Sequence, residues 1–200
     1  MKLYFVPNAC SLSPHIALRE LGLSHELERV DLATKKTVSG RDFLAVNPKG
    51  YVPALEFDNG QVLTEGVAIL LYLAQQAPNS VPDAGSWEYI RLVEALNFIS
   101  TEIHKGIGTL FSMEDGPAKE KAKEKIQPRL AYLAQQLQGK DYFLGDFTLA
   151  DAYLFTTLRW TAFLGISLAD YPVLTQYLER VAARPQVAEA LQVESPVAVS

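Results

Sequence analysis

Apolar and polar positions in the first part of the chain alternate between the periods of strands and helices. Residues 3–6 are apolar throughout and predict a strand, and residues 14–20 then predict a helix. Residues 26–32 predict a second, weaker strand, followed by a short helical piece over 42–46. This strand–helix–strand–helix order is typical of a βαβ unit with a parallel sheet.

Two further strands and a buried helix complete this region. Residues 54–57 form the next apolar run, and the Asp-Asn-Gly turn at 58–60 predicts that residues 61–63 pair back antiparallel. Residues 65–76 are apolar nearly all round, which predicts a helix buried between layers. We therefore expect an N-terminal domain over residues 1–78, with a four-stranded mixed sheet and three helices.

The rest of the chain predicts only helices. Residues 79–86 are rich in proline, glycine, asparagine and aspartate and predict a linker. No convincing strand follows, so residues 87–200 are expected to form an all-helical bundle domain. The fold class is thus α/β plus all-α. Thr148-Leu149-Ala150-Asp151 is a capping box that opens a very apolar helix, and we assign Asp151 to folding.

Composition narrows the classes of function. A formal net charge of −5 argues against nucleic acid or an anionic membrane as the main partner. No segment approaches the ~18 uninterrupted apolar residues of a membrane span. The one cysteine excludes an intrachain disulfide. A free thiol fits a reducing compartment, and we expect a cytoplasmic protein.

That cysteine, Cys10, lies between the first strand and the first helix. Ser13 and Pro14 are expected to begin the helix, Ser13 as N-cap and Pro14 at the first helical position. Cys10 would then stand just before a helix N-terminus, where the helix dipole favours a thiolate. The segment Cys10-Ser11-Leu12-Ser13 looks like a redox Cys-x-x-Cys motif with serine as its second member. A buried cysteine acting as a small apolar residue is the alternative.

Glu65 and Gly66 open the helix expected over 65–76. Backbone N–H groups without partners in a first helical turn bind anions, and glycine lets a carboxylate approach closely. The Glu65 carboxylate offers a partner for an ammonium group. Together they would suit the α-amino-acid end of a small peptide, although ordinary helix capping explains the same residues.

A polar stripe is expected on the first long helix of the second domain. Asn97, Thr101, His104 and Lys105 fall at i, i+4, i+7 and i+8, and so on one face. A solvent-facing stripe is the simpler explanation, but histidine and lysine also supply a proton handler and an anion partner. No histidine, cysteine, aspartate or glutamate set has metal-ligand spacing, so no metal is expected.

Taken together, these motifs resemble the cytosolic glutathione transferases, over essentially the whole chain. The shared features are a thioredoxin-like domain with Val52-Pro53 before its third strand, Thr64-Glu65-Gly66 at its last helix, and an all-helical second domain. The chain specifically resembles the bacterial beta class in residues 1–5 and 9–13, in the segment 47–55, and from Asn97 through His104-Lys105-Gly106.

The resemblance implies a role for several residues. Cys10 would lie beside the sulfur of glutathione and form a mixed disulfide with it in one version of the chemistry. His104 would reach the same sulfur from the helical domain. Val52, with Pro53 in the cis form, would pair its backbone with the cysteinyl part of glutathione, as an added strand does.

The remaining expected contacts surround the two ends of glutathione. The resemblance implies that Glu65 and Gly66 hold the γ-glutamyl end, where relatives often have serine in place of Gly66, and that Lys35 and Lys105 approach the glycyl end. The other expected glutathione contacts are Ala9, Tyr51, Asn97 (from the partner subunit) and Thr101, and the expected electrophile-pocket residues are Phe111 and Trp160.

The predicted function is a homodimeric, detoxifying glutathione transferase that conjugates the glutathione thiolate to small hydrophobic electrophiles, with glutathione as co-substrate. Cys10 and His104 are the predicted catalytic pair. Glutathione-dependent disulfide exchange or peroxide reduction through a Cys10–glutathione disulfide is the alternative, because a Cys10 bonded to that sulfur would block conjugation. A non-catalytic binding protein on the same fold is the third hypothesis.

Overall fold

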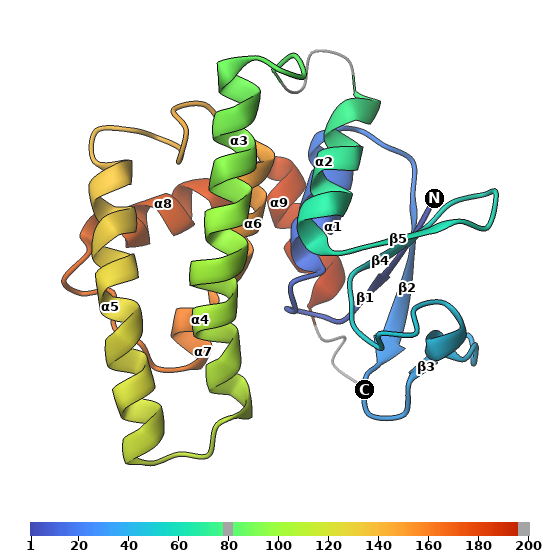
Figure 1. The fold of residues 1–200 in the computed structure, drawn as a ribbon, viewed down its shortest axis with the longest axis horizontal. Helices are drawn as coiled ribbons and strands as arrows, with labels where there is room; N and C mark the ends of the chain where they lie inside the picture. Colours follow the sequence, from blue (N-terminus) through green and yellow to red (C-terminus); the bar gives the residue numbers. More distant parts are fainter. Residues whose placement is uncertain (78–81, 196–200) are drawn as a thin grey trace. The chain divides into compact units, whose positions relative to one another are not determined.

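The computed structural model describes residues 1–77 and 82–195, which form two compact units (Figure 1). The first unit comprises Met1–Val81 and Pro185–Ser200, and the second comprises Pro82–Arg184. The expected linker over 79–86 lies partly outside the described residues. The last helix, α9 (Pro185–Glu194), thus groups with the first unit, whereas the sequence pattern placed it in the helical domain.

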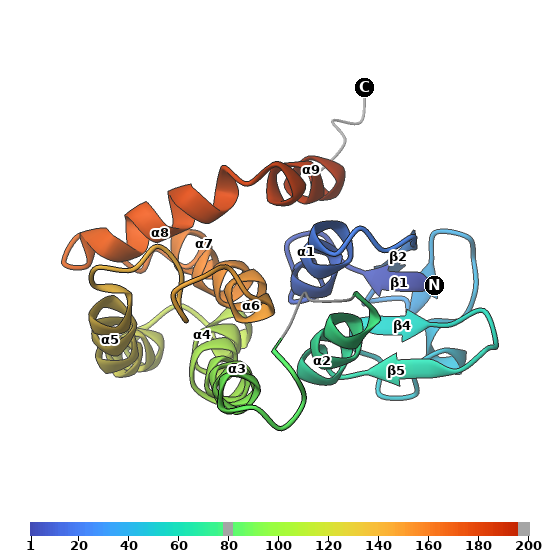
Figure 2. The ribbon, with the colours of Figure 1, turned by 90° about the horizontal axis from the view of Figure 1, so that it is seen from above.

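The first unit is built on a mixed sheet with the strand order β3-β2-β1-β4-β5. Only β1 and β2 are parallel, and every other pair is antiparallel. Figure 2 shows α1 and α2 on one face of this sheet. The elements of this unit, besides α9, are β1 (Lys2–Phe5), α1 (Leu12–Glu20), β2 (Glu26–Asp31), β3 (Lys36–Thr37), the 3₁₀ turn η1 (Phe43–Ala45), β4 (Ala54–Glu56), β5 (Val62–Thr64) and α2 (Gly66–Gln76).

All four expected strands are present, and the structure adds a fifth. Strand β3 has two residues and pairs with Val30 and Asp31 of β2. Its sequence, Lys-Thr, has no apolar alternation, so nothing in the pattern predicted it. Each face of the sheet has its own core. Leu3, Leu55 and Ile69 are fully buried, and a second cluster contains Tyr4, Val30, Phe43, Val46, Val52 and Ala54.

Helix α1 begins two residues earlier than predicted. Its first residue is Leu12 and Ser11 occupies the N-cap position, so Ser13 is not the cap and Pro14 is not the first helical residue. The reason is local hydrogen bonding. The Ser13 hydroxyl donates to the Cys10 carbonyl at 2.8 Å, and the Ser13 N–H donates to the same oxygen at 3.2 Å, which winds the turn before the helix.

A buried carboxylate holds α9 against α1. Glu194 accepts hydrogen bonds from the His15 ring at 2.8 Å and from the Asn8 N–H at 3.1 Å. Arg19 Nε donates to the other ring nitrogen of His15 at 2.9 Å, so that nitrogen carries no proton. Because an uncompensated buried charge is very costly, these partners are required for α9 to pack on α1.

The second unit contains only helical elements. One long rod runs through α3 (Trp87–Phe98), the π-helix η2 (Ile99–His104), α4 (Lys105–Gly108) and the 3₁₀ turn η3 (Thr109–Ser112). Its other helices are α5 (Pro117–Leu137), α6 (Leu149–Leu158), α7 (Trp160–Phe163) and α8 (Pro172–Ala182). Every residue of α6 is buried. No helix among the described residues has the length and apolar character needed to cross a bilayer.

The predicted capping box of α6 is confirmed and extended. The Thr148 hydroxyl accepts from Ala150 N–H, and the Asp151 carboxylate accepts from Thr148 N–H at 2.9 Å. Asp151 also accepts from Phe143 N–H at 2.8 Å and from the Tyr177 hydroxyl at 3.1 Å. One buried carboxylate therefore ties the start of α6 to the preceding loop and to α8.

We expect Asp151→Asn to lower the free energy of unfolding by about 3 kcal/mol. Both carboxylate oxygens accept hydrogen bonds, whereas the asparagine NH₂ would face donors. Urea denaturation would measure the change. The matched control is Asp170→Asn, an exposed aspartate, which should stay within about 0.5 kcal/mol of the wild type. Equal stability of the two variants would contradict the assignment.

Candidate functional site

The loop that carries Cys10 is fixed by two serines. The buried Ser11 hydroxyl accepts from Val6 N–H and donates to Val6 O, both at 3.1 Å, and so closes the loop onto the end of β1. Ser13 binds the Cys10 carbonyl, as described above. Ala9 packs with the Tyr4 cluster. These contacts hold the Cys10 backbone in one position.

The Cys10 thiol is a hydrogen-bond donor. Its sulfur lies 3.3 Å from the Val52 carbonyl oxygen, which can only accept. Burial raises the pKa of the thiol to about 11; hydrogen bonds from backbone N–H groups lower it less, and the negative charge of Glu65 raises it further. The expectation of a low-pKa thiolate is therefore wrong, because the thiol points to a carbonyl in a desolvated place and the helix dipole does not compensate.

The segment 47–53 contains Val52, whose carbonyl oxygen accepts the hydrogen bond of the Cys10 thiol. The Val52-Pro53 peptide bond is cis. The amide of Asn47, a buried residue, donates to the Tyr51 carbonyl at 2.7 Å and accepts from Lys49 N–H at 3.2 Å. Tyr51 itself is 70% exposed. Sequence reasoning missed Asn47 as a shaping residue, although an asparagine before proline is a known turn signal.

Glu65 and Gly66 lie at the start of α2, but the helix begins one residue later than predicted, because Gly66 is its first residue and Glu65 occupies the N-cap position. Glu65 has a φ of 71°, which is a strained conformation for a residue other than glycine and is typical of functional sites. Its exposed carboxylate lies 2.6 Å from Lys49 Nζ, a partner that the sequence did not suggest. A Cβ built on Gly66 would meet nothing within 4 Å, so open space lies beside the first N–H groups of the helix.

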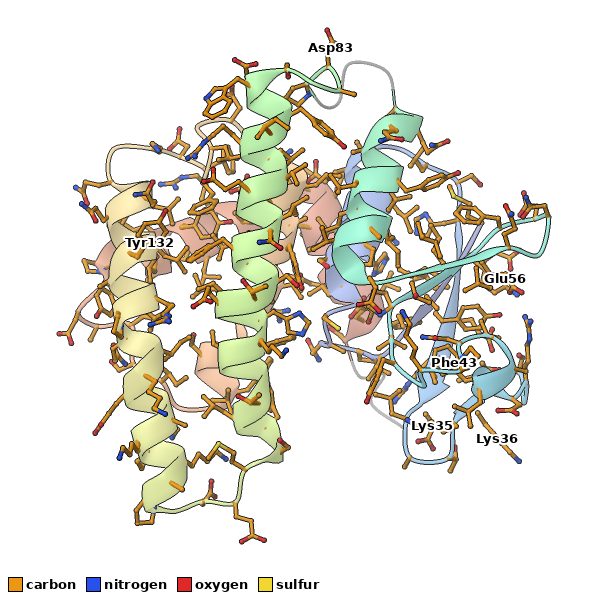
Figure 3. All side chains as sticks on the ribbon, in the orientation of Figure 1. Lys35, Lys36, Phe43, Glu56, Asp83 and Tyr132 are labelled. Atoms are coloured by element: carbon orange, nitrogen blue, oxygen red, sulfur yellow. The ribbon has the colours of Figure 1, made fainter. Side chains whose placement is uncertain are left out.

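Lys35 belongs to the same part of the first unit. Its ammonium group donates to the Gly50 carbonyl at 3.0 Å, and its φ is 57°. Figure 3 shows Lys35 just beyond the end of β2. The first unit therefore brings a protonated thiol, a carboxylate paired with Lys49, a second ammonium group from Lys35 and a helix N-terminus into one polar region around residues 47–53.

The polar stripe of the second unit is only partly as predicted. The π-helix η2 adds one residue to a turn, so residues after it are rotated relative to those before it. Asn97, Thr101 and Lys105 are exposed, and Thr101 donates to the Asn97 carbonyl at 3.1 Å. His104 is half-buried instead. The shared face assumed a regular α-helix, and the stripe therefore separates into an exposed group and an inward histidine.

His104 packs in an aromatic cluster. Its Nδ1 lies 2.6 Å from the Tyr153 hydroxyl of α6, and its ring centroid is 5.0 Å from that of Trp160. Burial lowers the pKa of the imidazole, so it is neutral at pH 7. Phe111 is 52% exposed and lies 5.7 Å from Trp160, so the two expected electrophile-pocket residues are in contact.

Gly108 and Tyr153 are further residues that the sequence did not single out. A Cβ on Gly108 would lie 3.4 Å from His104 Cδ2 and 3.6 Å from Trp160. A glycine four residues after a histidine is a weak signal in a sequence. Its relation to His104 is recognisable only when the position of the imidazole ring is known. Tyr153 gave no signal, because a tyrosine in an apolar helix is usually a core residue.

Two other features lie outside this set. A cavity of about 480 Å³ lies beside β2 and β3, lined among others by Val6, Leu32 and Val38, and none of the predicted site residues lines it. Within residues 1–77 and 82–195, no group of three acidic, histidine or cysteine side chains is arranged to hold a metal ion.

The structure thus combines a thioredoxin-like unit, with a thiol before its first helix and polar groups at the start of α2, and an all-helical unit. The family description "Glutathione S-transferase, N-terminal domain" matches residues 9–76, and "Glutathione S-transferase, C-terminal domain" matches residues 98–185. The chain is 42% identical to glutathione S-transferase GstA of Escherichia coli O157:H7, covering 97% of this chain and 98% of that protein.

Solved structures of glutathione S-transferases are also similar to this chain. A sphingomonad glutathione S-transferase complexed with glutathione is 45% identical, with a TM-score of 0.93, over 98% of this chain and all of the other. The beta-class enzyme of Sphingomonas chungbukensis is 44% identical, with a TM-score of 0.92 and the same coverage. The chain belongs to the glutathione S-transferase family and is a glutathione transferase of the bacterial beta-class type.

We expect Cys10 to react slowly with iodoacetamide at pH 7. With a pKa of about 11, its thiolate fraction is about a hundredfold below that of a thiol with a pKa of 9. Because thiolate forms only as the pH rises towards 11, the alkylation rate should still be increasing at pH 10. The protein has one cysteine, so intact mass follows the reaction without ambiguity. A rate that levels off below pH 8 would contradict the raised pKa.

Proposed function

We propose that this transferase conjugates the thiolate of glutathione to small hydrophobic electrophiles. The observation that carries the choice of chemistry is the Cys10 thiol, which donates to Val52 O and has a raised pKa. A protonated thiol is a poor nucleophile and a usable hydrogen-bond donor. It therefore suits an enzyme that stabilises the sulfur of its substrate better than one that attacks with its own.

Glutathione is proposed to bind around residues 47–53 and the start of α2. A sphingomonad relative is solved in complex with glutathione, which supports this choice of thiol substrate. The N–H groups of α2 suit the γ-glutamyl carboxylate, and the Glu65 carboxylate suits its ammonium group. Lys35 and Lys49 add positive charge for the carboxylates of the peptide. Lys105 and Thr101 are exposed in the second unit, and we retain them, with Asn97, as proposed contacts.

The Val52 carbonyl offers a way to bring Cys10 into the reaction. When the cysteinyl N–H of glutathione pairs with Val52, as an added strand would, this N–H competes with the Cys10 thiol for the carbonyl. The thiol is then free to donate to the glutathione sulfur. We propose that Cys10 and His104 both serve that sulfur. The thiolate forms a bond to the electrophilic carbon, the leaving group departs with its electron pair, and the thiol proton goes to solvent.

Disulfide exchange and peroxide reduction remain the second candidate. Both require a Cys10 thiolate that attacks a disulfide or a peroxide, and burial opposes its formation. A purely binding role is less well supported, because the residues that the family resemblance implies, Cys10, Glu65, Asn97 and His104, are all present. We further propose a cytoplasmic, homodimeric enzyme of detoxification, as the family resemblance implies.

We expect Cys10→Ser to keep conjugation of 1-chloro-2,4-dinitrobenzene within about threefold of the wild type, because serine retains a hydroxyl donor. Cys10→Ala removes the donor, and we expect its rate of conjugation to be about fivefold below that of Cys10→Ser, which corresponds to the loss of one hydrogen bond. Steady-state kinetics would measure both variants. Loss of all conjugation in Cys10→Ser would contradict the donor role of Cys10. The redox alternative predicts instead that Cys10→Ser abolishes disulfide exchange or peroxide reduction by the enzyme.

We expect Gly66→Ser to tighten glutathione binding about fivefold through one added hydrogen bond to the γ-glutamyl carboxylate. The space for the side chain is present, because a Cβ there meets nothing within 4 Å. Gly66→Ala is the matched control, since it adds the Cβ without the hydroxyl. Isothermal titration calorimetry would measure the dissociation constants. Equal affinity of Gly66→Ser and Gly66→Ala would show that position 66 does not face the ligand.

A further inference from the structure

We propose that Tyr153 fixes His104 as the Nε2–H tautomer, so that His104 meets its ligand as a hydrogen-bond donor and not as a base. Tyr153 is thus a positioning residue, which acts through His104. The inference rests on the proposed role of His104 towards the glutathione sulfur. It goes further by deciding which ring nitrogen carries the proton.

The length of the hydrogen bond identifies its donor. The Tyr153 hydroxyl oxygen lies 2.6 Å from His104 Nδ1. Hydrogen bonds donated by a hydroxyl group span roughly 2.5–3.0 Å, whereas those donated by N–H to oxygen span roughly 2.7–3.2 Å. A phenol is also a far better donor than a neutral imidazole, and an imidazole nitrogen is a far better acceptor than a phenol oxygen. The proton therefore belongs to Tyr153, and Nδ1 accepts it.

The imidazole must be neutral for Nδ1 to accept, and its surroundings keep it so. The ring contacts Tyr153 and Trp160, with centroids 5.7 and 5.0 Å away. Burial lowers the pKa of His104. A neutral imidazole carries one proton, and with Nδ1 accepting, that proton is on Nε2.

Space is left beside the Nε2 edge of the ring. The residue one turn further along the rod is Gly108, and a Cβ there would stand 3.4 Å from His104 Cδ2 and 4.0 Å from Nε2. Glycine at this position keeps that volume clear. Position 108 therefore puts no side chain against the Nε2 edge of the ring, whereas the Nδ1 side is closed by Tyr153.

The tautomer decides the chemistry of the residue. An Nε2–H group can donate to a thiolate and stabilise its charge, and it has no lone pair to remove a proton from a thiol. The opposite tautomer would present a lone pair and act as a general base. The glutathione thiol proton is therefore released to solvent on this account, and His104 holds the anion that remains.

The protein contains its own reference signals. It has three histidines. His25 Nδ1 lies 2.8 Å from the Leu23 carbonyl, which only accepts, so its proton is on Nδ1. His15 Nε2 accepts from Arg19, so its proton is also on Nδ1, directed at Glu194. His104 is the one histidine for which the structure assigns Nε2–H.

Two-bond ¹H–¹⁵N correlation spectra of the ¹⁵N-histidine-labelled full chain distinguish the two tautomers. We expect two Nδ1–H patterns and one Nε2–H pattern, and the latter should be missing from His104→Gln. An Nδ1–H pattern for His104 in the wild type would overturn the proposal. This readout needs no substrate, so loss of glutathione binding in a protein with the expected spectrum would refute the proposed function alone.

Tyr153→Phe keeps the ring and removes the hydroxyl. We expect a mixture of His104 tautomers and about a fivefold to tenfold fall in kcat, as for one lost hydrogen bond, with the KM for glutathione within about twofold. The control is Tyr132→Phe, an exposed tyrosine on α5 (Figure 3), which should leave the spectrum and kinetics unchanged. If the His104 spectrum of Tyr153→Phe is the same as that of the wild type, the positioning role is overturned. Any fall in kcat that accompanies this unchanged spectrum would then come from a structural effect of the substitution and not from the tautomer of His104.

Discussion

Every polar group that is buried in this protein must find a hydrogen-bond partner, and this constraint organises both units. In the first unit the Glu194 carboxylate is satisfied by His15 and by the Asn8 N–H, which draws the last helix onto the first. In the second unit Asp151 plays the same part for α6. Asn8 lies two residues before Cys10, so the carboxylate that closes the first unit also fixes the start of the thiol's loop. No buried side-chain nitrogen or oxygen among the described residues lacks a partner.

The same constraint sets the protonation of the candidate catalytic groups. Cys10 faces a carbonyl and so keeps its proton, and His104 faces a phenol hydroxyl and so keeps its proton on the far nitrogen. Both groups are then donors. Two donors suit the stabilisation of a thiolate that another molecule supplies, as we propose for the conjugation of glutathione. Disulfide chemistry would need the opposite arrangement, in which Cys10 is readily deprotonated.

Patterns that depend on neighbours in the sequence were predictable, and those that depend on distant partners were not. The four main strands and helix α2, to within one residue at its start, follow from local periodicity, and the box at Thr148 follows from capping. Strand β3 is too short to have a period, and the π-helix changes the register that placed His104 with Asn97. The prediction of a low Cys10 pKa was wrong because the causes that raise it, burial and the negative charge of Glu65, depend on the tertiary fold and on a residue far along the chain. The contact of Tyr153 with His104 could not be predicted for the same reason, since His104 lies 49 positions before it.

The central claim is that the reactive thiolate belongs to glutathione and not to the protein. Ultraviolet thiolate absorbance, titrated against pH for the free enzyme and for its glutathione complex, tests it most directly. The account predicts no thiolate band from the free enzyme until the pH nears the Cys10 pKa of about 11, and a band in the complex that appears at a lower pH than for glutathione in water. A free enzyme whose own thiolate band titrates near neutral pH would contradict the account.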